Sequence, residues 1–167
     1  MNCLEFITSS AEETQQVGRR LGELAQAGDV ILLVGELGTG KTCLTQGIAW
    51  GLGIEDYITS PSFVLIREHQ GRLPLYHIDL YRLDKMDEIT DLGLDDYLCG
   101  SGICVVEWAE KAFDFFPEEH LLVRLRHLGE TRRGLNLEPS GQRYEDVLTQ
   151  LGKTYADVER REKCNSP

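Results

Sequence analysis

The segment Val30–Thr42 has the sequence VILLVGELGTGKT, an uninterrupted apolar run followed by a glycine-rich loop. The run Val30–Val34 contains only Val, Ile and Leu, which is typical of a strand whose two faces are both buried. Strands of that kind belong to parallel sheets with helices on both sides. The segment therefore predicts an α/β fold with a mostly parallel central sheet flanked by helices.

The loop Gly35–Thr42 fits the pattern G-x-x-x-x-G-K-[ST] of a phosphate-binding loop, so we expect a P-loop NTPase. Its three glycines allow a tight turn in which successive backbone N–H groups point at phosphate oxygens. We expect Lys41 to reach the β- and γ-phosphates and to be catalytic, and the Thr42 hydroxyl to be a ligand of Mg²⁺. The backbone N–H of Cys43, which opens a predicted helix ending near Leu52, would lie near the α-phosphate, while its thiol plays no part. The nucleotide contacts expected from this segment are Gly35, Glu36, Leu37, Gly38, Thr39, Gly40, Lys41, Thr42 and Cys43.

A phosphate-binding loop works with a second acidic residue, at the end of a buried strand, that holds Mg²⁺ directly or through water. Glu107 is one candidate, because it follows the four apolar residues Ile103–Val106. Asp79 is the other, but its strand alternates as a surface hairpin would, which favours Glu107. Trp108, next to Glu107, is a candidate for packing near the nucleotide or, equally, for the core or an interface.

The rest of the chain continues the alternation of strands and helices. An antiparallel hairpin is predicted over residues 63–79, and an amphipathic helix from Tyr144 to about Lys163. We therefore expect an ATPase domain over residues 1–140, with residues 141–167 as a C-terminal helix and tail that are part of it or docked on it. The remaining expected elements are a strand at Leu4–Ile7, a helix from a cap at Thr8–Ser10 to about Ala27, helical structure over Asp84–Leu98 interrupted at Gly93, and a half-exposed strand at Leu121–Leu128.

The charge balance argues against nucleic-acid binding by this chain alone. Its 17 Lys and Arg residues are outnumbered by 28 Asp and Glu residues, which gives a net charge of −11. Affinity for DNA or RNA rests largely on basic side chains that neutralise phosphates. The candidates for a local basic patch are Arg124, Arg126, Arg132 and Arg133, which we expect to be ordinary solvated surface residues.

The sequence gives no sign of export or of a membrane span. The longest apolar run, Val30–Gly35, is far shorter than the ~20 residues that a spanning helix needs, and Met1–Glu5 lacks the basic start of a secretory signal. The five cysteines are an odd number without a C-x-x-C pair, which favours reduced structural thiols. We therefore expect a cytoplasmic protein without membrane contact.

Taken by themselves, these residues leave the function open between three alternatives. The motifs N-K-x-D and D-x-x-G are both absent, which favours ATP over GTP. A small-molecule kinase would need an acceptor pocket and a lid that closes over it. A nucleotide-driven switch would respond to partner proteins instead. A nucleotide-gated binding module would differ from the switch only in its negligible hydrolysis.

Four motifs together resemble the TsaE (YjeE) family, the bacterial ATPases required for threonylcarbamoyladenosine modification of tRNA beside the anticodon. They are GELGTGKT at 35–42, TSPSF at 59–63, LYHIDLYRL at 75–83 and VEW at 106–108. The resemblance covers about residues 5–130, with the motifs in order and at compatible spacing. The phosphate-binding loop alone would not select this family, but the HIDLYRL and VEW segments together do.

The resemblance implies that the chain binds ATP with Mg²⁺, hydrolyses it slowly alone, and resets a complex of TsaD and TsaB between turnovers. It also implies that Thr42 and Glu107 are the magnesium pair, and that Asp79 positions water or metal. The segment Thr59–Ser62 matches a switch-like loop that senses the γ-phosphate. The partner pair would hold the tRNA, which is consistent with the acidic charge of this chain; no DNA is expected.

Overall fold

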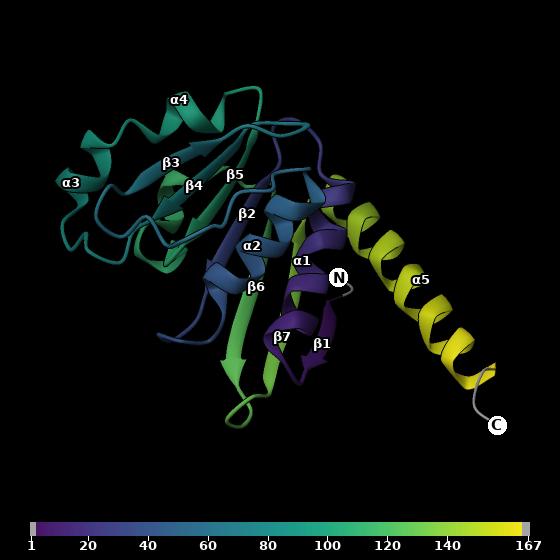
Figure 1. Ribbon diagram of the computed structural model, residues 1–167. Helices are drawn as coiled ribbons and strands as arrows, with labels where there is room; N and C mark the ends of the chain where they lie inside the picture. The colour runs from purple at the N-terminus through teal and green to yellow at the C-terminus, as the bar shows by residue number, and fades with distance from the viewer. Residues whose placement is uncertain (1–2, 165–167) are drawn as a thin grey trace.

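A seven-stranded mixed sheet forms the centre of the molecule (Figure 1). The computed structural model describes residues 3–164, with side chains up to Tyr155. The strand order is β1-β7-β6-β2-β5-β4-β3, and the three pairings among β6, β2, β5 and β4 are parallel. The predicted α/β fold with a mostly parallel centre is therefore confirmed. The strands are β1 (Leu4–Thr8), β2 (Val30–Val34), β3 (Ile66–His69), β4 (Leu75–Asp79), β5 (Ile103–Glu107), β6 (His120–His127) and β7 (Arg133–Ser140).

Helices cover both faces of this sheet. On one face, α1, α2 and α5 pack against alternate residues of the central strands, among them Leu33 and Val105. On the other face, α3, α4 and two 3-10 turns pack against the residues between, such as Leu32 and Val106. β2 and β5 are therefore buried along their whole length, as their apolar composition predicts. The helices are α1 (Ala11–Leu24), α2 (Lys41–Gly51), α3 (Met86–Asp91), α4 (Leu94–Leu98) and α5 (Gln142–Cys164), and the 3-10 turns are η1 (Ala109–Lys111) and η2 (Phe113–Phe115).

Elements outside the central strands also occur where the sequence places them. The Ser10 hydroxyl accepts a hydrogen bond from the Glu13 N–H and caps α1. Gly93, with a φ of 67°, separates α3 from α4. The first part of α5 packs on the sheet through residues such as Leu151, whereas the side chains beyond Tyr155, in the rest of the predicted amphipathic helix, lie outside the described part. No helix within residues 3–164 is both long enough and apolar enough to cross a bilayer.

One expectation about exposure is confirmed and one is wrong. The strand predicted at 121–128 is half exposed as a whole: β6 lies between β2 and β7, is buried from Leu121 to Val123 and is mostly exposed beyond Val123. β7 is not predicted from the sequence. The hairpin of β3 and β4 is present, but β4 pairs with β5 on its other side, so Asp79 ends an internal strand rather than a surface one.

The backbones of α1 and α2 are in direct contact. Four glycines lie where the two helices cross: Gly18 and Gly22 on α1, and Gly47 and Gly51 on α2. A Cβ built on Gly47 would lie only 2.1 Å from the backbone oxygen of Gln15. This close approach fixes α2, and with it the loop that precedes α2, against the rest of the domain.

We expect Gly47→Ala to lower the free energy of unfolding by about 1–3 kcal/mol, because the added methyl group must displace helix backbone. The matched control is Gly152→Ala in α5, where an added Cβ meets nothing within 4 Å. Ala is the better helix former by about 1 kcal/mol, so this control should be neutral or stabilising. Urea unfolding followed by circular dichroism measures both changes. Parental stability of Gly47→Ala would contradict the close contact.

Candidate functional site

The loop between β2 and α2 has the backbone conformation of an anion-binding loop. Gly38 and Gly40 have φ angles of 78° and 104°, in the left-handed region that side chains disfavour. α2 begins at Lys41, two residues before the predicted start at Cys43, and Gly40 is its N-cap. The backbone N–H groups of the first turn have no partner within the helix, and they lie at the positive end of its dipole. The loop therefore offers N–H groups to a phosphate.

Lys41 is held inside this loop and is only 5% exposed. Its Nζ donates hydrogen bonds to the carbonyl oxygens of Gly35, at 2.6 Å, and Glu36, at 2.9 Å. The same atom lies 4.2 Å from the centre of the Trp108 ring. Burial lowers the pKa of Lys41, and three nearby carboxylates act in the opposite direction. Oxygens of a bound phosphate can take the place of these two carbonyl oxygens, and their hydrogen bonds with Lys41 would be charge-assisted.

The carboxylate of Glu107 joins the loop to the sheet. Glu107 ends β5 and is 2% exposed. Thr42 donates a hydrogen bond of 2.8 Å from Oγ1 to Glu107 Oε1, and His77 Nε2 is hydrogen-bonded to Oε2. While donating its hydrogen, the Thr42 hydroxyl keeps oxygen lone pairs for a cation. The structure thus brings together the two residues that the sequence assigns to Mg²⁺.

Asp79 lies beside Glu107, because β4 and β5 pair in a register that sets these two residues opposite each other. Its carboxylate, also buried, is bound to a different part of the chain. Ser60 and Ser62 donate hydrogen bonds to Oδ2, the second at 3.1 Å, and the Tyr81 N–H donates to Oδ1 at 2.8 Å. Asp79 therefore anchors the segment after α2 to the end of β4.

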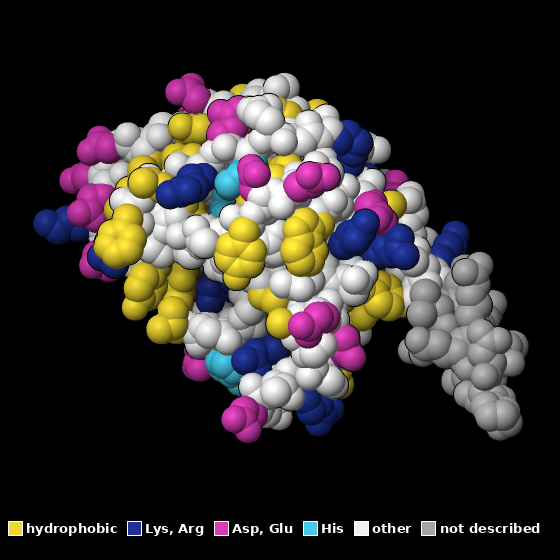
Figure 2. Space-filling view, viewed as in Figure 1, with side chains coloured by type: hydrophobic (Ala, Val, Ile, Leu, Met, Phe, Trp, Pro, Cys, Tyr) yellow, Lys and Arg dark blue, Asp and Glu magenta, His cyan; other side chains and the backbone are white. Residues whose placement is uncertain are grey.

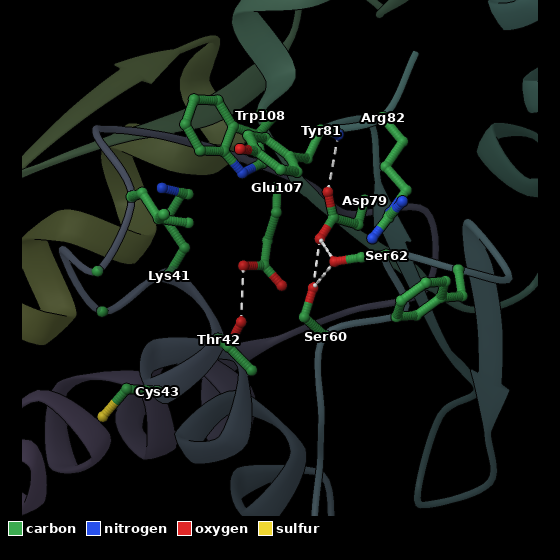
Figure 3. Close-up of a pocket in the computed structure, with 14 residues that line it drawn as sticks. Lys41, Thr42, Cys43, Ser60, Ser62, Asp79, Tyr81, Arg82, Glu107 and Trp108 are labelled. Atoms are coloured by element: carbon green, nitrogen blue, oxygen red, sulfur yellow. Dashed lines mark hydrogen bonds between the residues drawn. The ribbon is translucent and has the colours of Figure 1, made fainter.

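These groups line one pocket of about 380 Å³ (Figure 3). The Cys43 thiol points away from the carboxylates in Figure 3, and it donates to the carbonyl of Ala11 at 3.3 Å. Three predicted contacts, Gly35, Glu36 and Thr39, are absent from the described lining of the pocket. They shape the loop instead, since the Thr39 hydroxyl donates to the Glu36 carbonyl at 2.8 Å. The predicted residues that line the pocket are Leu37, Gly38, Gly40, Lys41, Thr42, Cys43, Asp79, Glu107 and Trp108.

Three further lining residues, Phe63, Tyr81 and Arg82, are not singled out by the sequence analysis. The Arg82 guanidinium lies 4.1 Å from the centre of the Phe63 ring, and the rings of Tyr81 and Trp108 are 4.9 Å apart. The pocket therefore has an aromatic rim above its charged floor. All three residues fall within the TSPSF and LYHIDLYRL motifs, so the signal that could have found them was their place in those motifs.

Three of the four arginines considered for nucleic-acid contact are engaged within the chain. Arg124 donates to Glu138 at 2.9 Å, and Arg126 forms an ion pair with Glu5. Arg133 donates to backbone carbonyl oxygens of the turn between β6 and β7. This agrees with the expectation that they are ordinary surface residues.

The oxygen ligands in the pocket suit Mg²⁺ bound together with a nucleotide. In the part of the chain that the structure describes, no three His, Cys, Asp or Glu side chains are grouped so that they could hold a metal alone. A cation would rest on the Thr42 hydroxyl and the Glu107 carboxylate, with phosphate oxygens and water as the other ligands. Mg²⁺ is commonly bound in this way, through few protein groups plus substrate phosphates.

Fold and pocket together define an α/β protein with a phosphate-binding loop that faces two buried acids. The family model described as "Threonylcarbamoyl adenosine biosynthesis protein TsaE" matches residues 8–135, and the chain belongs to this family. It is 41% identical to TsaE of Bacillus subtilis, over 92% of this chain and 96% of that protein. It is 40% identical to TsaE of Treponema pallidum, over 80% of this chain and 99% of that protein. The crystal structure of Bacillus subtilis YdiB, 37% identical, superposes with a TM-score of 0.78 over 92% of this chain and 96% of that one.

We expect Asp79→Ala to loosen residues 59–64, because two serine hydroxyls and the Tyr81 N–H lose their acceptor. The free energy of unfolding should fall by about 1–3 kcal/mol, and proteolysis within the segment should become faster. Glu55→Ala is the matched control, because it removes an exposed acid a few residues before this segment. Urea unfolding and limited proteolysis read by mass spectrometry measure the two effects. If Asp79→Ala and Glu55→Ala behave alike in both, Asp79 does not anchor the segment.

Proposed function

We propose that this chain binds ATP with Mg²⁺, hydrolyses it slowly alone, and acts as a nucleotide-driven switch on a TsaD–TsaB complex that modifies tRNA. Membership of the TsaE family supports a role in the biosynthesis of threonylcarbamoyladenosine in tRNA. The hydrogen bond of 2.8 Å between Thr42 and Glu107 carries the nucleotide part of the proposal, because it joins a phosphate-binding loop to a buried acid on the sheet. The tRNA would contact the complex rather than this chain.

Each polar group of the pocket has a distinct task in this proposal. Lys41 would exchange its two carbonyl contacts for oxygens of the β- and γ-phosphates. Thr42 and Glu107 would hold Mg²⁺, which supplies positive charge where negative charge develops on the phosphates. Asp79, beside Glu107, would position the attacking water. Trp108 would report binding, since its ring contacts Lys41.

The segment that follows α2 supports a switch with a protein output. Ser60 and Ser62 are bound to the Asp79 carboxylate at the floor of the pocket, so a ligand that engages Asp79 changes what holds this segment. Tyr57 and Phe63, in the same part of the chain, are each 83% exposed. Figure 2 shows hydrophobic side chains exposed as separate groups on this side of the molecule. Exposed aromatic side chains near a nucleotide pocket suit contact with another protein.

We expect Glu107→Ala to lower ATP turnover about 10²-fold and to leave nucleotide affinity measurable, because the loop and Lys41 remain in place. Thr42→Ala should weaken Mg²⁺-dependent hydrolysis, because the cation would lose one of its two protein ligands. Steady-state phosphate release and equilibrium binding of a fluorescent ATP analogue measure the two quantities. If Glu107→Ala hydrolyses ATP at the wild-type rate, the second acidic residue of the site is Asp79 and not Glu107.

The whole proposal is tested by steady-state ATP hydrolysis, with Mg²⁺, of the chain alone and with a matching TsaD–TsaB pair. We expect the pair to stimulate hydrolysis strongly, and Lys41→Ala to abolish the stimulation. Absence of stimulation would contradict the switch. Stimulation by one hydroxylated metabolite instead of the proteins would identify a small-molecule kinase.

A further inference from the structure

His77 is a buried histidine that the proposed function leaves without a role. It is the third residue of β4 and is completely inaccessible to solvent, with an exposure of 0%. On β4 it pairs in register with Arg67 of β3 and Val105 of β5, so it is enclosed by neighbouring strands. An imidazole in such a place must find partners for its polar atoms within the protein.

Among the residues that the structure describes, the ring has one polar contact, with the candidate magnesium ligand. His77 Nε2 is hydrogen-bonded to Glu107 Oε2, while Nδ1 has no hydrogen-bond partner within the described residues. An ionised carboxylate only accepts hydrogen bonds, so Nε2 carries the hydrogen of this contact. Among the described residues, the ring thus has one nitrogen without a partner and the other directed at Glu107.

The two oxygens of Glu107 are therefore held by two different elements. His77 holds Oε2 from β4, and Thr42 holds Oε1 from α2. A glutamate side chain has three rotatable bonds, and two fixed hydrogen bonds at its end restrict them to one arrangement. Without His77, only the Thr42 contact would orient the carboxylate.

We propose that His77 is a positioning residue, which orients Glu107 so that Oε1 faces Thr42 and the cation they share. The inference rests on the proposed binding of nucleotide with Mg²⁺. His77 does not touch the metal or the phosphates; it acts through Glu107. Hydrogen-bond partners of metal ligands typically contribute about 10–100-fold in metal affinity or activity.

Two substitutions that introduce side chains of nearly equal size distinguish the positioning of Glu107 from simple filling of the buried space. His77→Gln can place an amide N–H where Nε2 lies, whereas His77→Met has the same length and no donor. Both fill the buried site, and Met adapts well to irregular apolar spaces. Ile78→Val, on the same strand but on the opposite face of the sheet, is the control for a small loss of packing.

The measurement is the fluorescence of Trp108, which contacts Lys41 at the pocket. A Trp50→Phe background removes the second tryptophan of the chain. A non-hydrolysable ATP analogue is titrated first in EDTA, and MgCl₂ is then titrated into the analogue complex. We expect all variants to bind the analogue alike in EDTA. The Mg²⁺ concentration at the midpoint should rise about tenfold or more in His77→Met and stay within about threefold of the parent in His77→Gln and Ile78→Val.

A double variant tests whether His77 acts through Glu107. In a Glu107→Gln background, His77→Met should produce little further rise in the Mg²⁺ midpoint, because the group that it orients has already been changed. A full additional rise would show that His77 acts by another route and would overturn the inference.

The outcomes distinguish this inference from the proposed function. An unchanged midpoint in His77→Met overturns the positioning role alone. A midpoint raised equally in His77→Gln and His77→Met also overturns it, because the ring shape rather than the donor would then matter. If the parent protein binds no analogue, or binds it without response to Mg²⁺, the proposed function fails and the inference fails with it.

Discussion

The register in which β5 pairs with β2 and β4 is the constraint on which the site depends. It sets Glu107 opposite Leu33 on one side and opposite Asp79 on the other. Parallel strands end at the same edge of a sheet, so the loop after β2 brings Lys41 and Thr42 to the same place as both acids. A slip of one residue would turn Glu107 to the opposite face, away from α2. The polar cluster at the pocket floor therefore exists only because an apolar strand pairing is correct.

The centre of the fold and most of the residues that line the pocket could be predicted because they have local signatures. A strand buried on both faces is apolar throughout, as Val30–Val34 is, and a phosphate-binding loop has fixed glycine spacing. β7 has no such signature, because it contains glycine and proline and becomes a strand only by pairing with β1 and β6. The exposure of β4 was misjudged for the same reason, since β5 covers it on its other side. The hydrogen bond between His77 and Glu107 likewise has no local signature, because it depends on the pairing of β4 with β5.

Trp108 shows how the end of β5 is adapted to the pocket. It has a φ of 58°, a left-handed conformation that costs a bulky residue about 1–3 kcal/mol. This conformation turns the chain sharply after Glu107 and lays the indole against Lys41 and Tyr81. The contacts of the ring with Lys41 and Tyr81 offset the strain. Glycine adopts this conformation without strain, but at this position it would leave Lys41 without its aromatic contact.

The glycine contact between α1 and α2 also determines how the domain folds. Each of the four glycines is a poorer helix former than alanine by about 1 kcal/mol, and isolated helices of this length are marginal in water. Neither helix is therefore stable by itself, and each becomes stable when the other is docked. Because α2 carries Lys41 and Thr42, the binding groups are assembled cooperatively with the whole helical layer. Unwinding of the helix behind the glycine-rich loop therefore requires the pair of helices to separate.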